Sequence, residues 1–131
     1  MTSQDLTSLI QHWLSSSDYD WETAQTLYKS KKYPYSLFFG HLSIEKLLKA
    51  LYTKEHKKHA PFTHSLSYLA GKLSFELQKE QIQFLESINE FNIEARYPDE
   101  KLVFYKKADQ KFSKLNLKKM DELRQWLKKQ F

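Results

Sequence analysis

Three ionisable residues lie one helical turn apart in the most apolar stretch of the sequence. His41, Glu45 and Lys49 occur at intervals of four residues, which places them on one face of a helix. Paired ionisable groups in a partly buried setting gain reactivity, so Glu45 can orient the imidazole of His41 or pair with an arginine elsewhere. The other interpretation is that this helix needs one polar stripe toward solvent, and that these residues form it.

A second polar group surrounds one of only two arginines. Residues 94–99 read EARYPD, in a chain that uses lysine 19 times. A guanidinium can hold a carboxylate or phosphate through two parallel hydrogen bonds, which an ammonium cannot do. Arg96 is therefore a candidate anchor for an anionic ligand, with Tyr97 and Asp99 beside it. The alternative is a structural ion pair from Arg96 to Glu45 or Asp99.

Three of the five histidines lie close together, which raises the question of a metal site. His56, His59 and His64 fall within nine residues. The chain has no cysteine and no His-Glu-x-x-His pattern, and lysines flank two of these histidines, a setting that disfavours a cation. We therefore expect neither a metal nor a cofactor, and a packing or capping role for His64.

The last quarter of the chain is strongly basic. Residues 1–100 carry 11 Lys/Arg and 13 Asp/Glu, whereas residues 101–131 carry 10 and 3. A segment of this kind can contact phosphate or an acidic partner, and the aromatic residues between its lysines can stack on bases. A lysine-rich helix face that only faces water has the same pattern.

The elements that position these residues are predicted to be helices. The 131 residues suit one domain, residues 1–131, and two glycines and three prolines are too few for the turns of a β-sandwich. No Lys or Arg precedes Lys29, and no apolar run reaches about 18 residues, so we expect neither a secretory signal nor a membrane span, and a cytoplasmic location.

Helical spacing of apolar residues predicts five segments. They cover residues 6–28, 33–52, 66–73, 77–95 and 115–127. The serines at 15–17 either begin a second segment or lie exposed in one long, bent helix, and Pro98 ends the fourth segment by forcing Tyr97 out of helical geometry. The pattern of residues 99–109 is ambiguous. We predict an all-α fold, an up-and-down antiparallel bundle of about four long helices plus a short one.

Three sequence segments together resemble the HEPN domain, a helical family often encoded beside small nucleotidyltransferases. They are HLSIEKLLKALY in the central helix, THSLSYL after it, and ARYPD further on. The resemblance runs from about Asp18 to Phe131. It implies a bundle of about five helices, frequently a homodimer, that associates with nucleotides, RNA or a nucleotidyltransferase. Many members are metal-independent ribonucleases of toxin–antitoxin systems.

The sequence departs from the catalytic signature of those ribonucleases, an arginine followed roughly four to six residues later by a histidine. Neither Arg96 nor Arg124 has such a histidine. The leading interpretation is a homodimeric, non-catalytic module that binds a nucleotide, RNA or a nucleotidyltransferase, as part of a toxin–antitoxin-like pair. The expected ligand-binding residues are His41, Glu45, Lys49, Arg96, Tyr97 and Asp99.

Two alternatives remain open. The first is an endoribonuclease with a rearranged site, in which Arg96 stabilises the charge on phosphorus and His41 or His64 is the general base. The second is a structural adaptor whose basic C-terminal region is the interaction face. That face would consist of Lys106, Lys107, Lys111, Lys114, Lys118 and Lys119.

Overall fold

The computed structural model describes all 131 residues and contains helices but no strands, which confirms the all-α prediction. The helices are α1 (Ser3–Lys29), α2 (Tyr33–His56), α3 (Leu66–Gly71), α4 (Lys79–Ser87), α5 (Pro98–Lys107) and α6 (Gln110–Lys128), with 3-10 helices η1 (Ile88–Phe91) and η2 (Ile93–Ala95) between α4 and α5. None of them combines the length and apolar character needed to cross a membrane.

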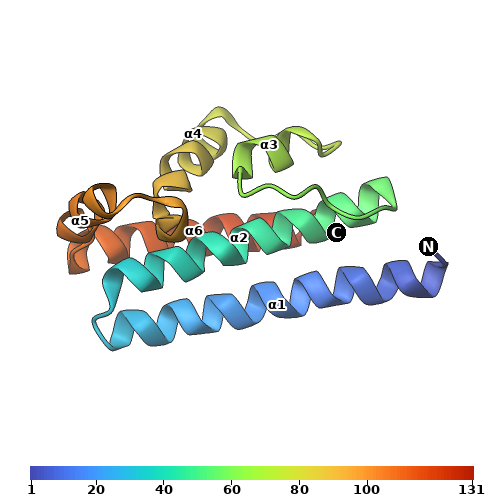
Figure 1. Ribbon diagram of the computed structural model, residues 1–131. Helices are drawn as coiled ribbons and strands as arrows, with labels where there is room; N and C mark the ends of the chain where they lie inside the picture. Colours follow the sequence, from blue (N-terminus) through green and yellow to red (C-terminus); the bar gives the residue numbers. More distant parts are fainter.

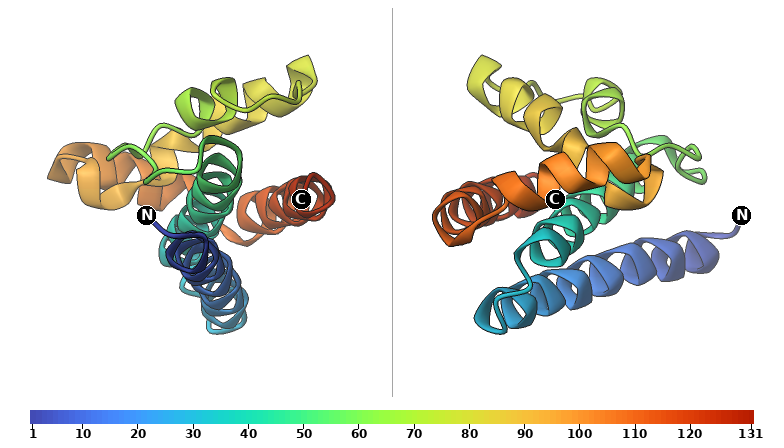
Figure 2. Two further views of the ribbon diagram at one scale, coloured as in Figure 1. Left: turned by 90° about the vertical axis from the view of Figure 1, so that its right-hand side faces the viewer. Right: turned by 60° about the vertical axis from the view of Figure 1, so that its left-hand side comes forward.

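The chain runs up and down as predicted. α1 and α2 form an antiparallel hairpin, α3, α4 and the 3-10 helices carry the chain back, and α6 lies beside α2 (Figure 1). Seen end-on, α2 is surrounded by α1, α6, the α3–α4 segment and α5 (Figure 2, left). Because α2 has neighbours on nearly every side, its apolar residues are buried around most of its circumference, which confirms the prediction of a central helix.

α1 is one continuous helix, which decides between the two interpretations of the serines at 15–17. Ser17 is fully buried, contrary to the expected exposure, and its hydroxyl donates to the carbonyl oxygen of Ser43. Further along, Ser36 donates to the carbonyl of Ala24 at 2.6 Å, and the Lys46 ammonium lies 2.6 Å from the Asp20 carboxylate. Short polar side chains therefore let α1 and α2 approach closely while satisfying buried hydrogen-bonding groups.

The segment expected as one helix over residues 77–95 is interrupted, so this part of the prediction is wrong. α4 covers only nine residues, and Asn92 adopts a non-helical conformation with ψ of 78° between the two 3-10 helices. Asparagine competes with the helical backbone for hydrogen bonds, which favours such a break. Tyr97 is extended before Pro98, as predicted, but Pro98 also begins α5, which the sequence pattern left undecided.

Replacement of Gly40 by valine is expected to destabilise the fold, because α2 and α6 approach closely at this glycine. A Cβ atom there would lie 2.5 Å from the Sδ atom of Met120, and overpacking of a core costs about 1–3 kcal/mol. Urea denaturation of Gly40→Val should show this loss. Gly71→Val is the matched control, since a Cβ at Gly71 meets no atom within 4 Å; equal losses in the two variants would contradict the close approach.

Candidate functional site

The carboxylate of Glu45 lies in the interior, and two cationic or ionisable groups bind it. Glu45 is 3% exposed. Its Oε2 accepts from the Lys49 ammonium at 3.1 Å, and its Oε1 lies 2.9 Å from Nδ1 of His64. The polar face of α2 therefore does not face solvent, so the interpretation of these residues as a solvent-facing stripe is wrong. Glu45, Lys49 and His64 instead form a buried ionic cluster, in which each buried charge needs a partner of this kind to be stable.

The segment between α2 and α3 brings His64 to this carboxylate. α2 ends at His56 and Lys57 follows in a left-handed conformation, with φ of 55°. Ser65 caps α3 by accepting from the backbone N–H of Tyr68, which fixes the residue before it. Because a carboxylate oxygen only accepts, Nδ1 of His64 carries the proton, and Nε2 is left free on a side chain that is 67% exposed.

Arg96 lies beside His64 but does not contact Glu45. Its Nη1 donates to Glu100 at 3.0 Å, so the expected ion pair to Glu45 or Asp99 is wrong. The reason is that Arg96 follows η2 in an extended conformation, one turn before Glu100 in α5. Both partners are half-exposed, and such pairs contribute only about 0–1 kcal/mol, so an anionic ligand can replace Glu100.

His64 and Arg96 line a common cavity, which we call the His64–Arg96 cleft. Its volume is about 280 Å³. The lining residues are His64, Ser65, Asn89, Asn92, Ala95, Arg96 and Glu100. Asn89 also lines the cleft, and its Oδ1 atom is buried without a hydrogen-bond partner.

A more apolar hollow adjoins the cleft. It measures about 440 Å³ and shares His64, Asn92 and Ala95 with the cleft. Phe38, Phe39 and Leu42 of α2 line it, together with Glu94. A cationic end next to aromatic and aliphatic side chains can hold a ligand that combines an anionic group with a flat apolar ring.

The other predicted site residues lie outside the cleft. His41 is fully buried and Lys49 is 7% exposed. Tyr97 and Asp99 are exposed at the start of α5 and do not line the cavity. The structure thus brings together Glu45, His64 and Arg96, with His64 taking the position at Glu45 that spacing had suggested for His41.

His41 is a buried histidine without a hydrogen-bond partner on either ring nitrogen. Burial lowers its pKa from 6.5 to about 4; the Glu45 carboxylate opposes this shift, and His64 adds to it. His41 is therefore neutral at pH 7, and with no exposed surface it cannot reach a ligand as the molecule stands. Of the two histidines considered as a general base, only His64 is accessible.

The second arginine, Arg124, has a structural role that the sequence pattern did not predict. Arg124 of α6 is 3% exposed and donates to Ser17 at 2.7 Å and to Asp18 at 2.8 Å. Burial would raise the pKa of Asp18, but Lys128 and Arg124 hold it below its usual range. Arg124 therefore joins α6 to α1, and the rarity of arginine in this chain was the signal that could have indicated a special role.

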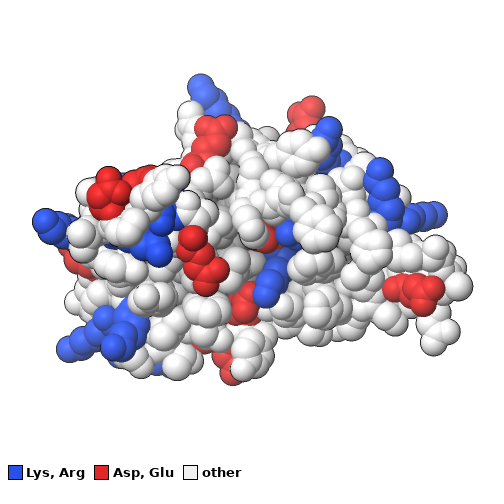
Figure 3. Space-filling model, in the orientation of Figure 1, with Lys and Arg blue, Asp and Glu red and all other residues white.

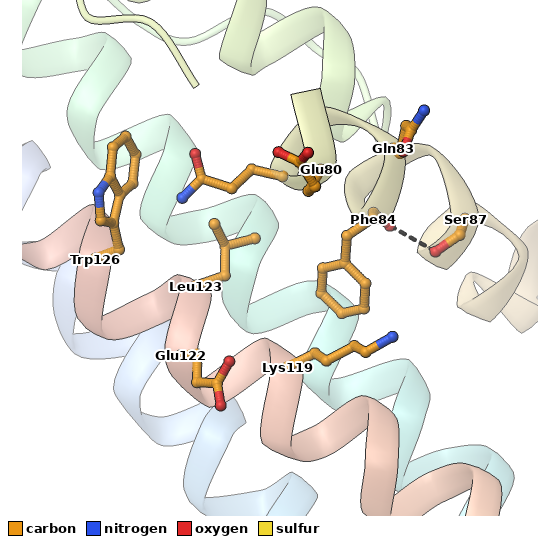
Figure 4. A pocket seen from close by; sticks show the side chains of 9 residues that line it. Glu80, Gln83, Phe84, Ser87, Lys119, Glu122, Leu123 and Trp126 are labelled. Carbon is orange, nitrogen blue, oxygen red and sulfur yellow. Dashed lines mark hydrogen bonds between the residues drawn. The ribbon is translucent and has the colours of Figure 1, made fainter. Parts of the chain in front are cut away.

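A groove that the sequence patterns did not predict lies between α4 and α6. It measures about 640 Å³. Phe84, Leu123 and Trp126 provide its apolar surface, and Glu80, Glu122 and Lys119 lie around them (Figure 4). α4 packs on α3 and η1 rather than along α6, and this leaves the groove open.

The lysines of the C-terminal region lie in different surroundings. Lys107 pairs with Glu90 at 2.8 Å, Lys119 lines the α4–α6 groove, and Lys114 and Lys118 line a different hollow beside α1. Figure 3 shows the opposite face of the molecule, with α6 behind α2, and acidic and basic side chains are interspersed there. No group of three or more His, Asp or Glu residues is arranged to hold a metal ion.

Comparison with known proteins identifies the family of this arrangement. The model of the HEPN domain matches residues 10–130. Among solved structures, TT1696 from Thermus thermophilus is similar, with a TM-score of 0.78 and 15% sequence identity over 93% of this chain and 98% of that one. At this identity the likeness concerns the fold alone. No curated protein matches the sequence.

Acidification is expected to destabilise the protein through His41. Between pH 6.5 and about 4 the unfolded chain binds a proton at this residue that the folded chain does not, so the free energy of unfolding falls as the pH falls. The full effect is about 3 kcal/mol. Urea denaturation at pH 7 and pH 4.5 should show a smaller decrease in His41→Phe than in the wild type; an unchanged decrease would mean that His41 is not the group responsible.

Proposed function

Because this chain belongs to the HEPN domain family, we propose that it is a non-catalytic module that binds a nucleotide or RNA in the His64–Arg96 cleft. The observation that carries the proposal is the placement of His64 and Arg96 on one cavity of about 280 Å³. A guanidinium in a small cavity is suited to one phosphate group, and the free Nε2 of the His64 imidazole can accept from a hydroxyl of the same ligand. Glu45 supports the site by holding the imidazole of His64.

The adjoining hollow suits the rest of a nucleotide. Phe38 and Phe39 lie edge to face with ring centroids 5.5 Å apart, and both line the hollow. Nucleobases stack on such rings, and contacts of this kind contribute about 1–3 kcal/mol per base. A nucleotide would thus place its phosphate near Arg96 and its base near Phe39, with His64 between them.

The family resemblance further supports two partners, which we include in the proposal. One is a second copy of the chain, and the other is a nucleotidyltransferase, in a toxin–antitoxin-like pair. Leu102 and Val103 of α5 are 62% and 69% exposed, so this helix offers apolar surface that a partner protein would cover. Light scattering of the purified protein tests the homodimer, and a mass equal to one chain would contradict it.

Nucleotide binding should depend on the guanidinium of Arg96. Arg96→Ala is expected to weaken binding of fluorescent nucleoside triphosphates and of labelled RNA by about tenfold or more, since a charged hydrogen bond contributes about 1.5–3 kcal/mol. Arg96→Lys keeps the charge but loses the paired hydrogen bonds, so its affinity should lie between the two. Fluorescence anisotropy measures all three proteins.

Lys32→Ala is the matched control for a loss of positive charge, because Lys32 is exposed and forms no ion pair. Its affinity should equal that of the wild type. Unchanged affinity in Arg96→Ala, or an equal loss in Lys32→Ala, would contradict the assignment of the ligand to this cleft.

The free Nε2 atom of His64 favours a second candidate function, an endoribonuclease. Glu45 holds Nδ1 as the donor, so Nε2 can accept the proton of a ribose 2′-hydroxyl while the 2′-oxygen attacks the phosphorus. The P–O5′ bond then breaks, and the leaving 5′-oxygen takes a proton from the His64 imidazolium or from water, which leaves a 2′,3′-cyclic phosphate and a 5′-hydroxyl. Arg96 would stabilise the negative charge that develops on the phosphate oxygens. This arrangement requires no histidine after Arg96 in the sequence.

Incubation of labelled RNA with the protein in the presence of a chelator separates the two functions. The non-catalytic proposal predicts intact RNA that remains bound. Cleavage that His64→Asn and Arg96→Ala both abolish would establish the ribonuclease instead. Cleavage that survives both substitutions would point to a contaminating enzyme.

A further inference from the structure

A small hollow between α1 and α6 combines aromatic rings with unpaired lysines. Its volume is about 260 Å³. The residues that line it are Trp21, Gln25, Tyr28 and Lys29 of α1 and Lys114, Leu117, Lys118 and Asp121 of α6. In the end-on view α1 and α6 lie together on one side of α2, whereas α5, which follows Arg96, lies on another (Figure 2, left).

Three lysines of this hollow have no carboxylate partner, as is the case for most lysines of the chain. Lys29, Lys114 and Lys118 form no ion pair, whereas Lys46 and Lys128 are paired with carboxylates within the chain. Against three ammonium groups the lining has one carboxylate, that of Asp121. The hollow is therefore a local concentration of uncompensated positive charge, which attracts phosphate groups.

The aromatic rings are held in place by other contacts. The Arg124 guanidinium lies 5.3 Å from the centre of the Trp21 ring, and Ser17 and Asp18 fix that guanidinium. Trp21 and Tyr28 are both half-buried, so part of each ring faces the hollow. Fixed aromatic rings between lysines offer a stacking surface for a base and cations for the phosphates beside it.

We propose that this hollow binds one nucleotide of a single-stranded nucleic acid, with the base against Trp21 and Tyr28 and the phosphates at Lys29, Lys114 and Lys118. The volume supports one base of a longer strand, because pockets for complete small-molecule ligands measure about 300–1,000 Å³. An acidic peptide would engage the lysines but give the rings no partner. The inference requires neither His64 nor Arg96, so it does not depend on the function proposed above.

The test measures binding of a fluorescein-labelled oligouridylate by anisotropy at several salt concentrations. The double variant Lys114→Ala/Lys118→Ala should bind about tenfold more weakly, and the slope of log affinity against log salt should become smaller in magnitude by about 1.4, the value for two phosphate contacts with a single strand. Lys106→Ala/Lys111→Ala is the matched control. It removes the same charge from residues that line none of the cavities described above, and it should change neither quantity appreciably.

Equal losses in the two double variants would overturn the inference, because they would show diffuse attraction to the whole basic region. Effective competition by polyglutamate against the oligouridylate would overturn it in favour of an acidic peptide. The variant Arg96→Ala distinguishes binding in this hollow from binding in the His64–Arg96 cleft. If Arg96→Ala abolishes oligouridylate binding and Lys114→Ala/Lys118→Ala does not, the inference fails and the proposed function stands. If Arg96→Ala still binds the oligouridylate and Lys114→Ala/Lys118→Ala does not, the inference stands and the proposed binding of RNA in the cleft fails.

Intrinsic fluorescence gives a second, direct readout of the same site. A base stacked on Trp21 should quench its emission, so oligouridylate should quench the wild type and have a much smaller effect on Trp21→Phe, which keeps an aromatic ring in the same place. Trp13 and Trp126 lie outside the hollow and serve as internal controls. Quenching of equal size in Trp21→Phe would overturn the placement of the base.

Discussion

The burial of one carboxylate within the central helix determines how the candidate site is built. Glu45 is almost fully removed from water, and an unpaired charge in such a place costs several kcal/mol. Lys49 offsets part of that cost from the same helix. The remaining oxygen is satisfied by His64, a residue from the segment that leads into α3. The path of that segment, and the orientation of its imidazole, therefore follow from the need to pair this carboxylate.

The interrupted helical segment of residues 79–95 leads to the opposite side of the cleft. A continuous helix over residues 77–95 would have directed its polar side chains along one axis. Instead α4 ends at Ser87, Asn92 separates the two 3-10 helices that follow, and the extended Arg96 and Tyr97 lead into α5. This turn brings the Arg96 side chain to the cavity that His64 lines. The site thus depends on an irregular segment held against the regular and deeply buried α2.

The sequence predicted the fold better than the contacts within it. Periodicity identified α2 as central because helix periodicity and burial are local properties that the order of apolar residues records. It did not predict that His64 pairs with Glu45, since their contact spans 19 residues and depends on the loop path. It also missed the burial of Arg124, whose partners Ser17 and Asp18 lie more than 100 residues away. Charge pattern alone suggested one basic face, whereas the folded chain places Lys119 in the α4–α6 groove and Lys114 and Lys118 in the hollow beside α1.

The central claim is that Glu45 positions His64 in the cleft beside Arg96, and the tautomer of His64 tests it most directly. Nitrogen NMR of the imidazole should show the proton on Nδ1 in the wild type and a shift toward the Nε2-protonated form in Glu45→Met, which removes the acceptor, with thermal unfolding as the check on folding. If the single variant does not fold, Glu45→Met/Lys49→Met removes the unpaired ammonium and takes its place. A wild-type imidazole protonated mainly on Nε2, or a tautomer ratio unaffected by the substitution, would contradict the account.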